Sequence, residues 1–267
     1  TNISSFLWNY YNSNNSIFIF YWMVALCLKK WIYFSFLTIL PSSSNSTLDD
    51  IAKYMYLFPI VGIIIGILVG SFGFGLSFLL DPIIVSFLVV TSIVIITGIH
   101  HADGLADFAD GLMVKGSKEK KLNAMKDLST GSAGVVAIVL YLIGLVVTIS
   151  LTTGFDLFKA ILISEILAKF SMVLLASLGN SAAIGSNSPF MKIMKDKKKL
   201  MAAFIIMIIP IALLGETTGL IMLSVTIIVT LIILLISSRS FGGITGDVLG
   251  STNELTRLAS LMVFVSL

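Results

Sequence analysis

Hydrophobic and polar stretches alternate along the whole chain, and most of the hydrophobic ones are long enough to cross a membrane. The run from 58 to 80 carries no charged residue over 23 positions, and the run from 83 to 99 carries none over 17. A helix needs about 20 apolar residues to cross the hydrocarbon core of a bilayer. Eight hydrophobic segments follow this pattern, at residues 17–40, 57–80, 82–99, 134–154, 157–178, 200–215, 218–236 and 255–267. We therefore predict an all-α, polytopic bundle of about seven to eight transmembrane helices, which forms a single membrane domain over residues 1–267.

Composition supports this class and excludes others. Apolar residues make up 57% of the 267 positions and charged residues only 12%, with a mean hydropathy of +1.04. Soluble domains average about 45–50% apolar and about 25% charged. The single cysteine, Cys27, excludes a disulfide framework and a cysteine-based zinc site. The net charge of +3 comes from clustered lysines, so we expect no nucleic-acid partner.

Long and short polar connections alternate along the chain. The long ones lie at residues 41–56, 100–133, 179–199 and 237–254, so counting crossings places all four on one face of the membrane. The segments 100–133 and 179–199 carry five lysines each, whereas residues 1–28, on the opposite face, have no Lys or Arg. The positive-inside rule therefore predicts that the long loops are cytoplasmic. Residues 1–30 form an N-terminal extension whose role the sequence leaves open.

The polar segment 100–133 holds the densest group of acids. Asp103, Asp107 and Asp110 are spaced i, i+4, i+7, which places them on one face of a helix. Carboxylates held close together are costly at neutral pH unless a cation lies among them. Oxygen ligands of this kind suit Mg²⁺ or Mn²⁺, which commonly link carboxylates to substrate phosphates. We predict an active-site loop that binds Mg²⁺, with Mn²⁺ as an alternative, rather than a solvated amphipathic helix.

Two further polar segments have features that suit the same site. Asp127 precedes a Ser-Thr-Gly stretch that opens directly into a helix, where free N–H groups favour phosphate, although Ser and Thr are also ordinary helix caps. Asp247 and Glu254 are seven residues apart and share a helix face, and Gly246 frees the backbone beside the aspartate. Because both segments lie on the predicted face of the Asp-rich loop, we expect one site built from separate loops.

Glu165 and Lys169 are two charges, four residues apart, inside the hydrophobic segment 157–178. Charges at membrane depth are costly and mark a functional or internally paired site. An i, i+4 ion pair within one helix is the alternative. The sequence leaves both interpretations open.

These motifs resemble the cobalamin synthase family, adenosylcobinamide-GDP ribazoletransferase. The resemblance rests on the run from His101 to Leu112, His-Ala-Asp-Gly-Leu-Ala-Asp-Phe-Ala-Asp-Gly-Leu, with support from Phe36–Pro41, Phe58–Gly62, Met125–Asp127, Gly131 and Gly243–Gly250. It implies an enzyme of a prokaryotic plasma membrane that joins α-ribazole, or its 5′-phosphate, to adenosylcobinamide-GDP and releases GMP. Membrane lipids are further expected partners, and a homo-oligomer is compatible with the sequence.

The resemblance also assigns roles to residues of the polar segments. The implied catalytic residues are His101, Asp103 and Asp107; the implied metal ligands are Asp103, Asp107, Asp110, Asp127 and Asp247; the implied ligand-binding residues are Lys126, Ser129, Thr130, Gly131, Gly246 and Glu254. On a continuous helix His100, not His101, joins the face of Asp103, whereas the family's His-x-Asp motif selects His101. A helix break near Gly98 would reconcile the two.

Two other classes of protein share part of this pattern. CDP-alcohol phosphotransferases also use an Asp-Gly-x-x-Ala motif with spaced acids, but they have Arg directly after the Ala, where this chain has Asp107. A secondary transporter places charges such as Glu165 at a midplane site and is built from two matching halves. The sequence shows no such internal repeat.

Overall fold

The computed structural model describes residues 37–38, 47–127, 129–182 and 188–267. The predicted extension 1–30 and most of the hydrophobic segment 17–40 and of the Phe36–Pro41 motif lie outside these residues. The elements are α4 (Leu48–Lys53), the 3₁₀ helix η1 (Met55–Leu57), α5 (Phe58–Leu76), α6 (Pro82–Thr97), α7 (His100–Met113), α8 (Lys118–Ala124), α9 (Ser132–Ser150), α10 (Gly154–Leu178), α11 (Ser188–Met194), α12 (Lys197–Leu214), α13 (Glu216–Ser240) and α14 (Gly246–Ser266). Within the described residues the only β-type pairing is a single bridge, Ser181 to Ile244, so the predicted all-α class is confirmed.

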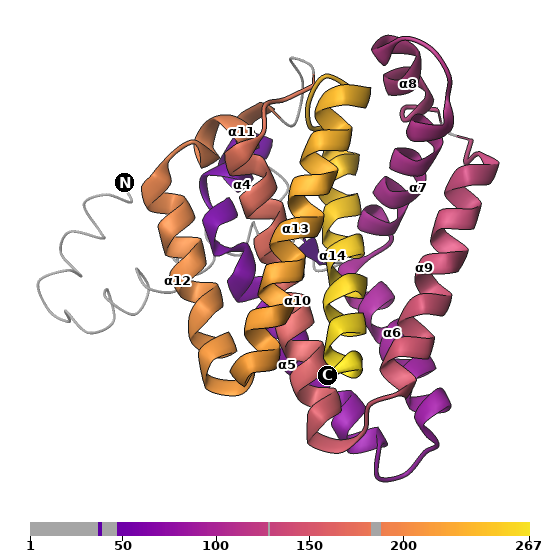
Figure 1. Ribbon diagram of the computed structural model, residues 1–267, viewed down its shortest axis with the longest axis vertical. Helices are drawn as coiled ribbons and strands as arrows, with labels where there is room; N and C mark the ends of the chain where they lie inside the picture. The colour runs from indigo at the N-terminus through magenta and orange to yellow at the C-terminus, as the bar shows by residue number, and fades with distance from the viewer. Residues whose placement is uncertain (1–36, 39–46, 128, 183–187) are drawn as a thin grey trace, which may run out of the picture.

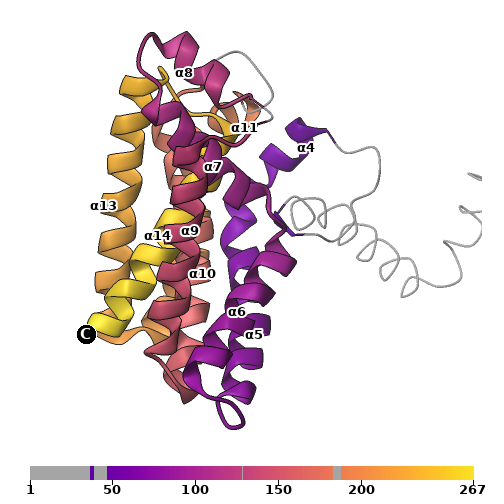
Figure 2. The ribbon, with the colours of Figure 1, turned by 90° about the vertical axis from the view of Figure 1, so that its right-hand side faces the viewer.

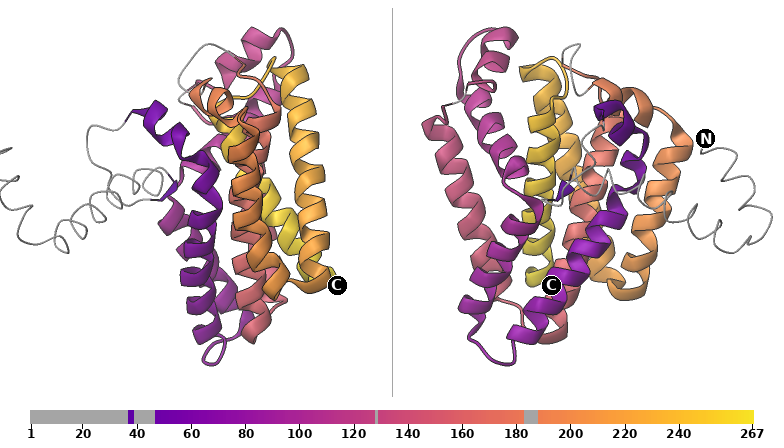
Figure 3. Two further views of the ribbon diagram at one scale, coloured as in Figure 1. Left: turned by 90° about the vertical axis from the view of Figure 1, so that its left-hand side faces the viewer. Right: turned by 180° about the vertical axis from the view of Figure 1, so that it is seen from behind.

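The long helices run alongside one another, and their connections separate by length (Figure 1). The short connections α5–α6, α9–α10 and α12–α13 lie at one end of the bundle, whereas α8, α11 and the α13–α14 connection lie at the other. The views of Figures 2 and 3 show the same division. The predicted gathering of the long polar segments on one face is therefore confirmed for the segments that the structure describes.

Among the described residues, fewer helices qualify as membrane spans than the predicted hydrophobic segments there suggested. Four helices of the described residues are long and apolar enough to cross a membrane, namely Met55–Leu76, α9, α10 and α13. A fifth crossing arises only if α6 and α7, which are bent by 92° at their junction, count as one broken span. Helix α12 begins on three lysines, and α14 carries Asp247, Glu254 and Arg257, so neither is as apolar as its hydrophobic segment suggested.

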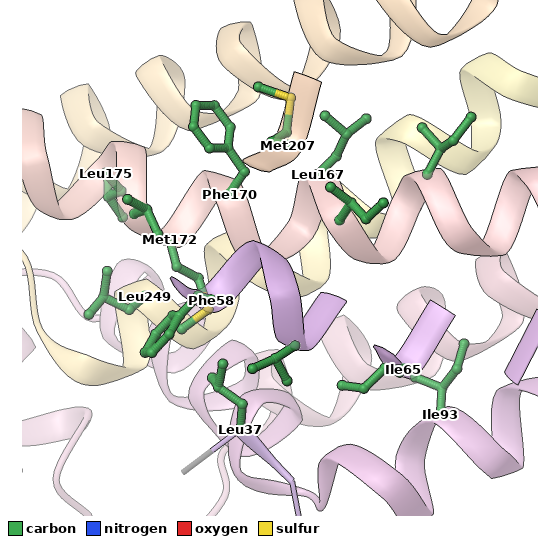
Figure 4. Packing of buried hydrophobic residues seen from close by; sticks show 14 of the residues in the cluster. Leu37, Phe58, Ile65, Ile93, Leu167, Phe170, Met172, Leu175, Met207 and Leu249 are labelled. Atoms are coloured by element: carbon green, nitrogen blue, oxygen red, sulfur yellow. The ribbon is translucent and has the colours of Figure 1, made fainter. Parts of the chain in front are cut away.

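Helix α10 lies at the centre of the bundle, and 83% of its most apolar 18-residue stretch is buried. Figure 4 shows its side chains Leu167 and Phe170 among side chains of neighbouring helices, including Phe58 of α5 and Met207 of α12. Small residues let α5 approach it closely: a Cβ on Gly62 would lie 2.6 Å from the Glu165 carbonyl oxygen. Close contact through small residues is the usual way in which membrane helices pack.

A break at Gly98 gives α7 its direction. Gly98 has φ 68°, a value that favours glycine, and it ends α6 before α7 begins at His100. A break is therefore present near Gly98, but both histidines follow it on the same helix as Asp103, so it does not bring His101 to the face of the acids. Helix α7 then buries His101, Leu105 and Phe108 against the bundle and turns its acids the other way.

Candidate active site

The acids of the Asp-rich segment share one face of α7. Asp103 is exposed, and Asp107 and Asp110 are half-buried. Most of the residues between them are buried, namely Gly104, Leu105, Ala106 and Phe108. An amphipathic helix separates its residues in this way when one side packs on a core and the other faces solvent or a ligand. The predicted common face of the three aspartates is therefore confirmed.

Helix α14 brings a fourth acid to this face. Thr245 caps α14 by accepting a hydrogen bond from the Val248 N–H at 3.2 Å, which places Asp247 in the first turn. A Cβ built on Gly104 would lie 3.0 Å from the Asp247 Cα and carbonyl oxygen, and the Ser251 hydroxyl donates to the Gly104 carbonyl at 2.9 Å. The two acidic segments, 143 positions apart when Gly104 is compared with Asp247, therefore meet through their backbones.

Electrostatics shows that these carboxylates interact. Burial, together with the negative charges of Asp103, Asp247 and Asp110, raises the pKa of Asp107 to about 6. Burial also raises the pKa of Asp247, and a hydrogen bond from Thr245 partly opposes that change. The charges of four acids thus concentrate on one small surface, which favours a cation there.

The chemistry of these donors fits Mg²⁺ or Mn²⁺. Across the described residues, no three His, Cys, Asp or Glu side chains converge closely enough to form a complete metal cage. Mg²⁺ rarely uses such a cage, because it is usually held by one or two carboxylates together with substrate phosphates. Asp103, Asp107 and Asp247 supply carboxylates of this kind from two helices.

Asp110 has a different set of contacts from the other acids. Its carboxylate accepts hydrogen bonds from the Gly131 N–H at 2.7 Å and from the Gly134 N–H at 2.9 Å, so it caps the start of α9. A Cβ on Gly131 would lie 2.5 Å from that carboxylate, so a larger residue at this position would clash with Asp110. The Gly131 N–H, which we expected to bind phosphate, therefore donates its hydrogen bond to the Asp110 carboxylate.

The remaining residues of the predicted phosphate segment lie on the surface. Lys126, Asp127, Ser129 and Thr130 are all exposed. The Ser129 N–H donates to the Asp127 carboxylate at 3.0 Å, which makes a local turn. These four side chains thus remain accessible to a ligand beside the start of α9, and their predicted roles stay predictions.

The structure separates the two histidines. His100 is exposed, whereas His101 is 7% exposed and lies on the buried side of α7, away from the acidic face. The His101 Nδ1 atom is 3.9 Å from Glu254 Oε1 and has no hydrogen-bond partner. A Cβ on Gly250 would lie 3.2 Å from the His101 Cα, so His101 sits at the crossing of α7 and α14.

Glu254 lies deeper than the sequence suggested. It shares a face of α14 with Asp247, as expected, but it is 3% exposed and lies two turns further into the bundle. Its carboxylate accepts hydrogen bonds from the Tyr141 hydroxyl, the Arg257 guanidinium and the Asn253 amide, the last at 2.7 Å. Its surroundings are those of an internal charge partner, whereas a ligand site was predicted.

Glu165 and Lys169 also bond across helices. Glu165 accepts from Arg257 Nε at 2.6 Å, and the Lys169 ammonium donates to the Asn253 side-chain oxygen at 2.8 Å. The two charges are therefore paired internally. Their hydrogen bonds join α10 to α14 and do not form an i, i+4 pair within α10. Sequence reasoning missed Arg257 as the partner of Glu165; the only signal was a charge inside the last hydrophobic segment.

Comparison with known proteins identifies the family to which this chain is related. The family described as cobalamin-5-phosphate synthase matches residues 29–265. Similar curated proteins include the adenosylcobinamide-GDP ribazoletransferases of Methanocella arvoryzae, 37% identical over 86% of this chain and 92% of the relative, and of Methanococcoides burtonii, 36% identical over 86% and 89%. The protein of the same name from Archaeoglobus fulgidus is 36% identical over 85% of this chain and 92% of its own length.

No solved structure matches the chain significantly. The sequence relationship nevertheless spans nearly every described element, from α4 to α14. It includes the acidic face of α7 and the start of α14, the two segments that the structure brings together. The chain therefore belongs to the cobalamin-5-phosphate synthase family.

Proposed function

We propose that this chain joins α-ribazole, or its 5′-phosphate, to adenosylcobinamide-GDP with release of GMP, at the acidic face of α7 and α14. The observation that carries the proposal is the meeting of Asp103 and Asp107 with Asp247, from distant segments, at one end of the bundle. The relatives bear the name of this reaction and cover the same residues. Neither a CDP-alcohol enzyme nor a transporter is favoured by these relatives.

The reaction is a displacement at phosphorus. A ribose hydroxyl of α-ribazole, with or without a phosphate on its 5′ position, loses its proton and forms a bond to the cobinamide-side phosphorus of the diphosphate. The bond from that phosphorus to the bridging oxygen breaks, so that GMP leaves. Such a transfer depends on in-line positioning and on neutralisation of the leaving phosphate. A divalent cation held between the diphosphate and one or two of the carboxylates of Asp103, Asp107 and Asp247 would supply that neutralisation.

The other residues of the site have positioning roles in this proposal. Asp110 fixes the start of α9 to α7, and thereby holds the exposed Ser129 and Thr130 near the acids. When the nucleophile is a hydroxyl, a carboxylate of the acidic face takes its proton, because His101 lies on the buried side of α7.

The site faces the cytoplasm in this proposal. Exposed lysines, among them Lys115, Lys118 and Lys126, lie on the polar segments at the same end as the acids. Positive charges near a membrane favour the cytoplasmic side, and they attract an anionic substrate to the surface around the acids.

The proposal is tested with the purified protein in detergent, adenosylcobinamide-GDP, α-ribazole and Mg²⁺. We expect GMP and the cobalamin product to appear in equal amounts, with the same result or a faster rate when the ribazole 5′-phosphate is supplied. Consumption of a CDP-alcohol without any release of GMP would contradict the proposal. Omission of the ribazole is the control for simple hydrolysis.

A further inference from the structure

A group of paired charges lies inside the bundle, beneath the acidic face. Glu165 and Lys169 of α10 and Arg257 of α14 are 0% exposed, and Glu254 of α14 is 3% exposed. Two acids and two bases balance, and Tyr141 of α9 adds a hydroxyl to the same network. Removing charges from water is costly unless each ion is paired and hydrogen-bonded. We call these four charged residues the buried charge cluster.

Arg257 is the link between the helices. Its Nε donates to Glu165 Oε1 at 2.6 Å and its Nη2 to Glu165 Oε2 at 3.3 Å, so the two groups meet fork to fork. Its Nη1 donates to the Tyr141 hydroxyl at 2.8 Å and to the Glu254 carboxylate. A planar guanidinium that bonds three partners in this way fixes both the depth and the rotation of its helix.

The same helix carries Asp247 of the proposed active site. Asp247 lies ten residues before Arg257 on α14, about 15 Å along a continuous helix. Near Asp247, α7 and α14 pack too closely to accommodate an added methyl group without moving. A Cβ on Gly104 would be 3.0 Å from the Asp247 Cα, and a Cβ on Gly250 would be 3.2 Å from the His101 Cα. A small slide or rotation of α14 must therefore shift Asp247 relative to the acids of α7.

We propose that Glu165, Arg257 and Glu254 are positioning residues, which hold α14 in the register that sets Asp247 against Asp103 and Asp107. The inference rests on the proposed function, since it assigns these residues to the same site. It goes beyond stability, because it predicts that small changes in the buried pair alter the geometry of the acidic face in protein that remains folded.

Two variants that conserve charge test the proposal. Arg257→Lys replaces the fork by a single ammonium, and Glu165→Asp shortens the acceptor by one methylene. The matched control is Ser171→Ala, which removes a buried hydrogen bond of 2.9 Å to Thr256 at the same α10–α14 contact without touching the buried charge cluster. Each protein is compared as the monodisperse folded fraction in detergent.

The first measurement needs no activity. In a Cys27→Ser background, nitroxide labels on cysteines replacing Met113 of α7 and Met262 of α14, which are 71% and 46% exposed, report the distance between the helices by pulsed electron paramagnetic resonance. We expect the distance distribution to shift or broaden in Arg257→Lys and Glu165→Asp and to match the parent in Ser171→Ala. Unchanged distributions in both charge-conserving variants would overturn the proposal.

The second measurement links the register to the site. We expect kcat to fall about 10- to 100-fold in both variants, as is usual for a displacement of about 1 Å, together with a higher half-saturating Mg²⁺ concentration. Parent-like kinetics for each folded molecule would contradict a positioning role. Failure of both variants to fold, with Ser171→Ala folded, would also contradict it, because the cluster would then serve the fold alone. Should the parent release no GMP, the proposed function fails, whereas the label distances still decide the register.

Discussion

Two charged regions share helix α14 but differ in how their charges are balanced. At its start, Asp247 joins Asp103 and Asp107 on a partly exposed face, where burial and neighbouring acids raise the pKa of Asp107 and of Asp247. Two to three turns further on, Arg257 lies fully buried and bonds to Glu165 and other partners. Like charges that lie close together at the exposed end indicate a site that a ligand completes. Opposite charges paired in the interior indicate a contact that fixes the relative position of the helices.

The largest expected effect comes from removing an acid of the open face. Asp107→Asn should lower turnover at least about 100-fold, because a charge that stabilises the leaving phosphate through the bound cation is lost. The folded fraction in detergent should not fall, since the change relieves repulsion among neighbouring acids. Asp156→Asn is the control, because it removes an exposed acid from the first turn of α10, at the opposite end of the bundle.

Whereas Asp107→Asn should mainly lower turnover, Arg257→Met should mainly lower stability. It leaves Glu165 and Glu254 buried without their shared partner, and breaking such a pair costs about 3–5 kcal/mol of unfolding free energy. The change can be measured by titration with a denaturing detergent. Adding Glu165→Gln should recover part of the loss, and Arg239→Met, at an exposed position of α13, should cost little. If the unfolding free energy of Arg257→Met is within error of the parent's, the buried charge cluster does not stabilise the fold, and the proposed difference between the two regions is wrong.

Gly104→Ala probes the contact between α7 and α14 at the acidic face. The added methyl group would lie 3.0 Å from the Asp247 Cα, so α7 and α14 must separate by a few tenths of an ångström. We expect a cost of about 1–3 kcal/mol in unfolding free energy and a fall in kcat. Gly75→Ala meets nothing within 4 Å and should leave both quantities unchanged. Equal behaviour of the two variants would show that the close contact at Gly104 has no role.

The smallest effect is a pH dependence in metal-free protein. Because the folded pKa of Asp107 is about 6, above its usual 3.8, the folded state binds more protons than the unfolded state between these values. The unfolding free energy should therefore fall as pH rises from about 4 to about 6, and Mg²⁺ at pH 7 should restore part of it. Asp107→Asn should flatten this portion of the curve, and Asp156→Asn should not. A curve of the same shape in Asp107→Asn would contradict the assignment.

The sequence predicted the acidic face better than the interior. The i, i+4, i+7 spacing of Asp103, Asp107 and Asp110 is a local property of one helix, so it could be read directly, as could the break at Gly98. The pairing of Glu165 with Arg257 joins residues 92 positions apart, which no local pattern encodes.

The number of spans was misjudged for a related reason. Hydrophobic length alone does not distinguish a helix that faces lipid from one that buries charge against its neighbours. Helix α14 is of the second kind, because its buried Glu254 and Arg257 find partners on α9 and α10. Likewise, Asp110 was expected beside a metal, but a contact to Gly131 that depends on the placing of α9 gives it a capping position.

The central claim is that Asp107 and Asp247, from separate segments, act on one bound cation. A double-mutant cycle on the half-saturating Mg²⁺ concentration for GMP release tests it most directly. Asp107→Asn and Asp247→Asn should each raise that concentration, and the double variant should raise it by much less than the product of the single effects, because residues of one site are coupled. Multiplication of the two effects would show independent sites and contradict the account.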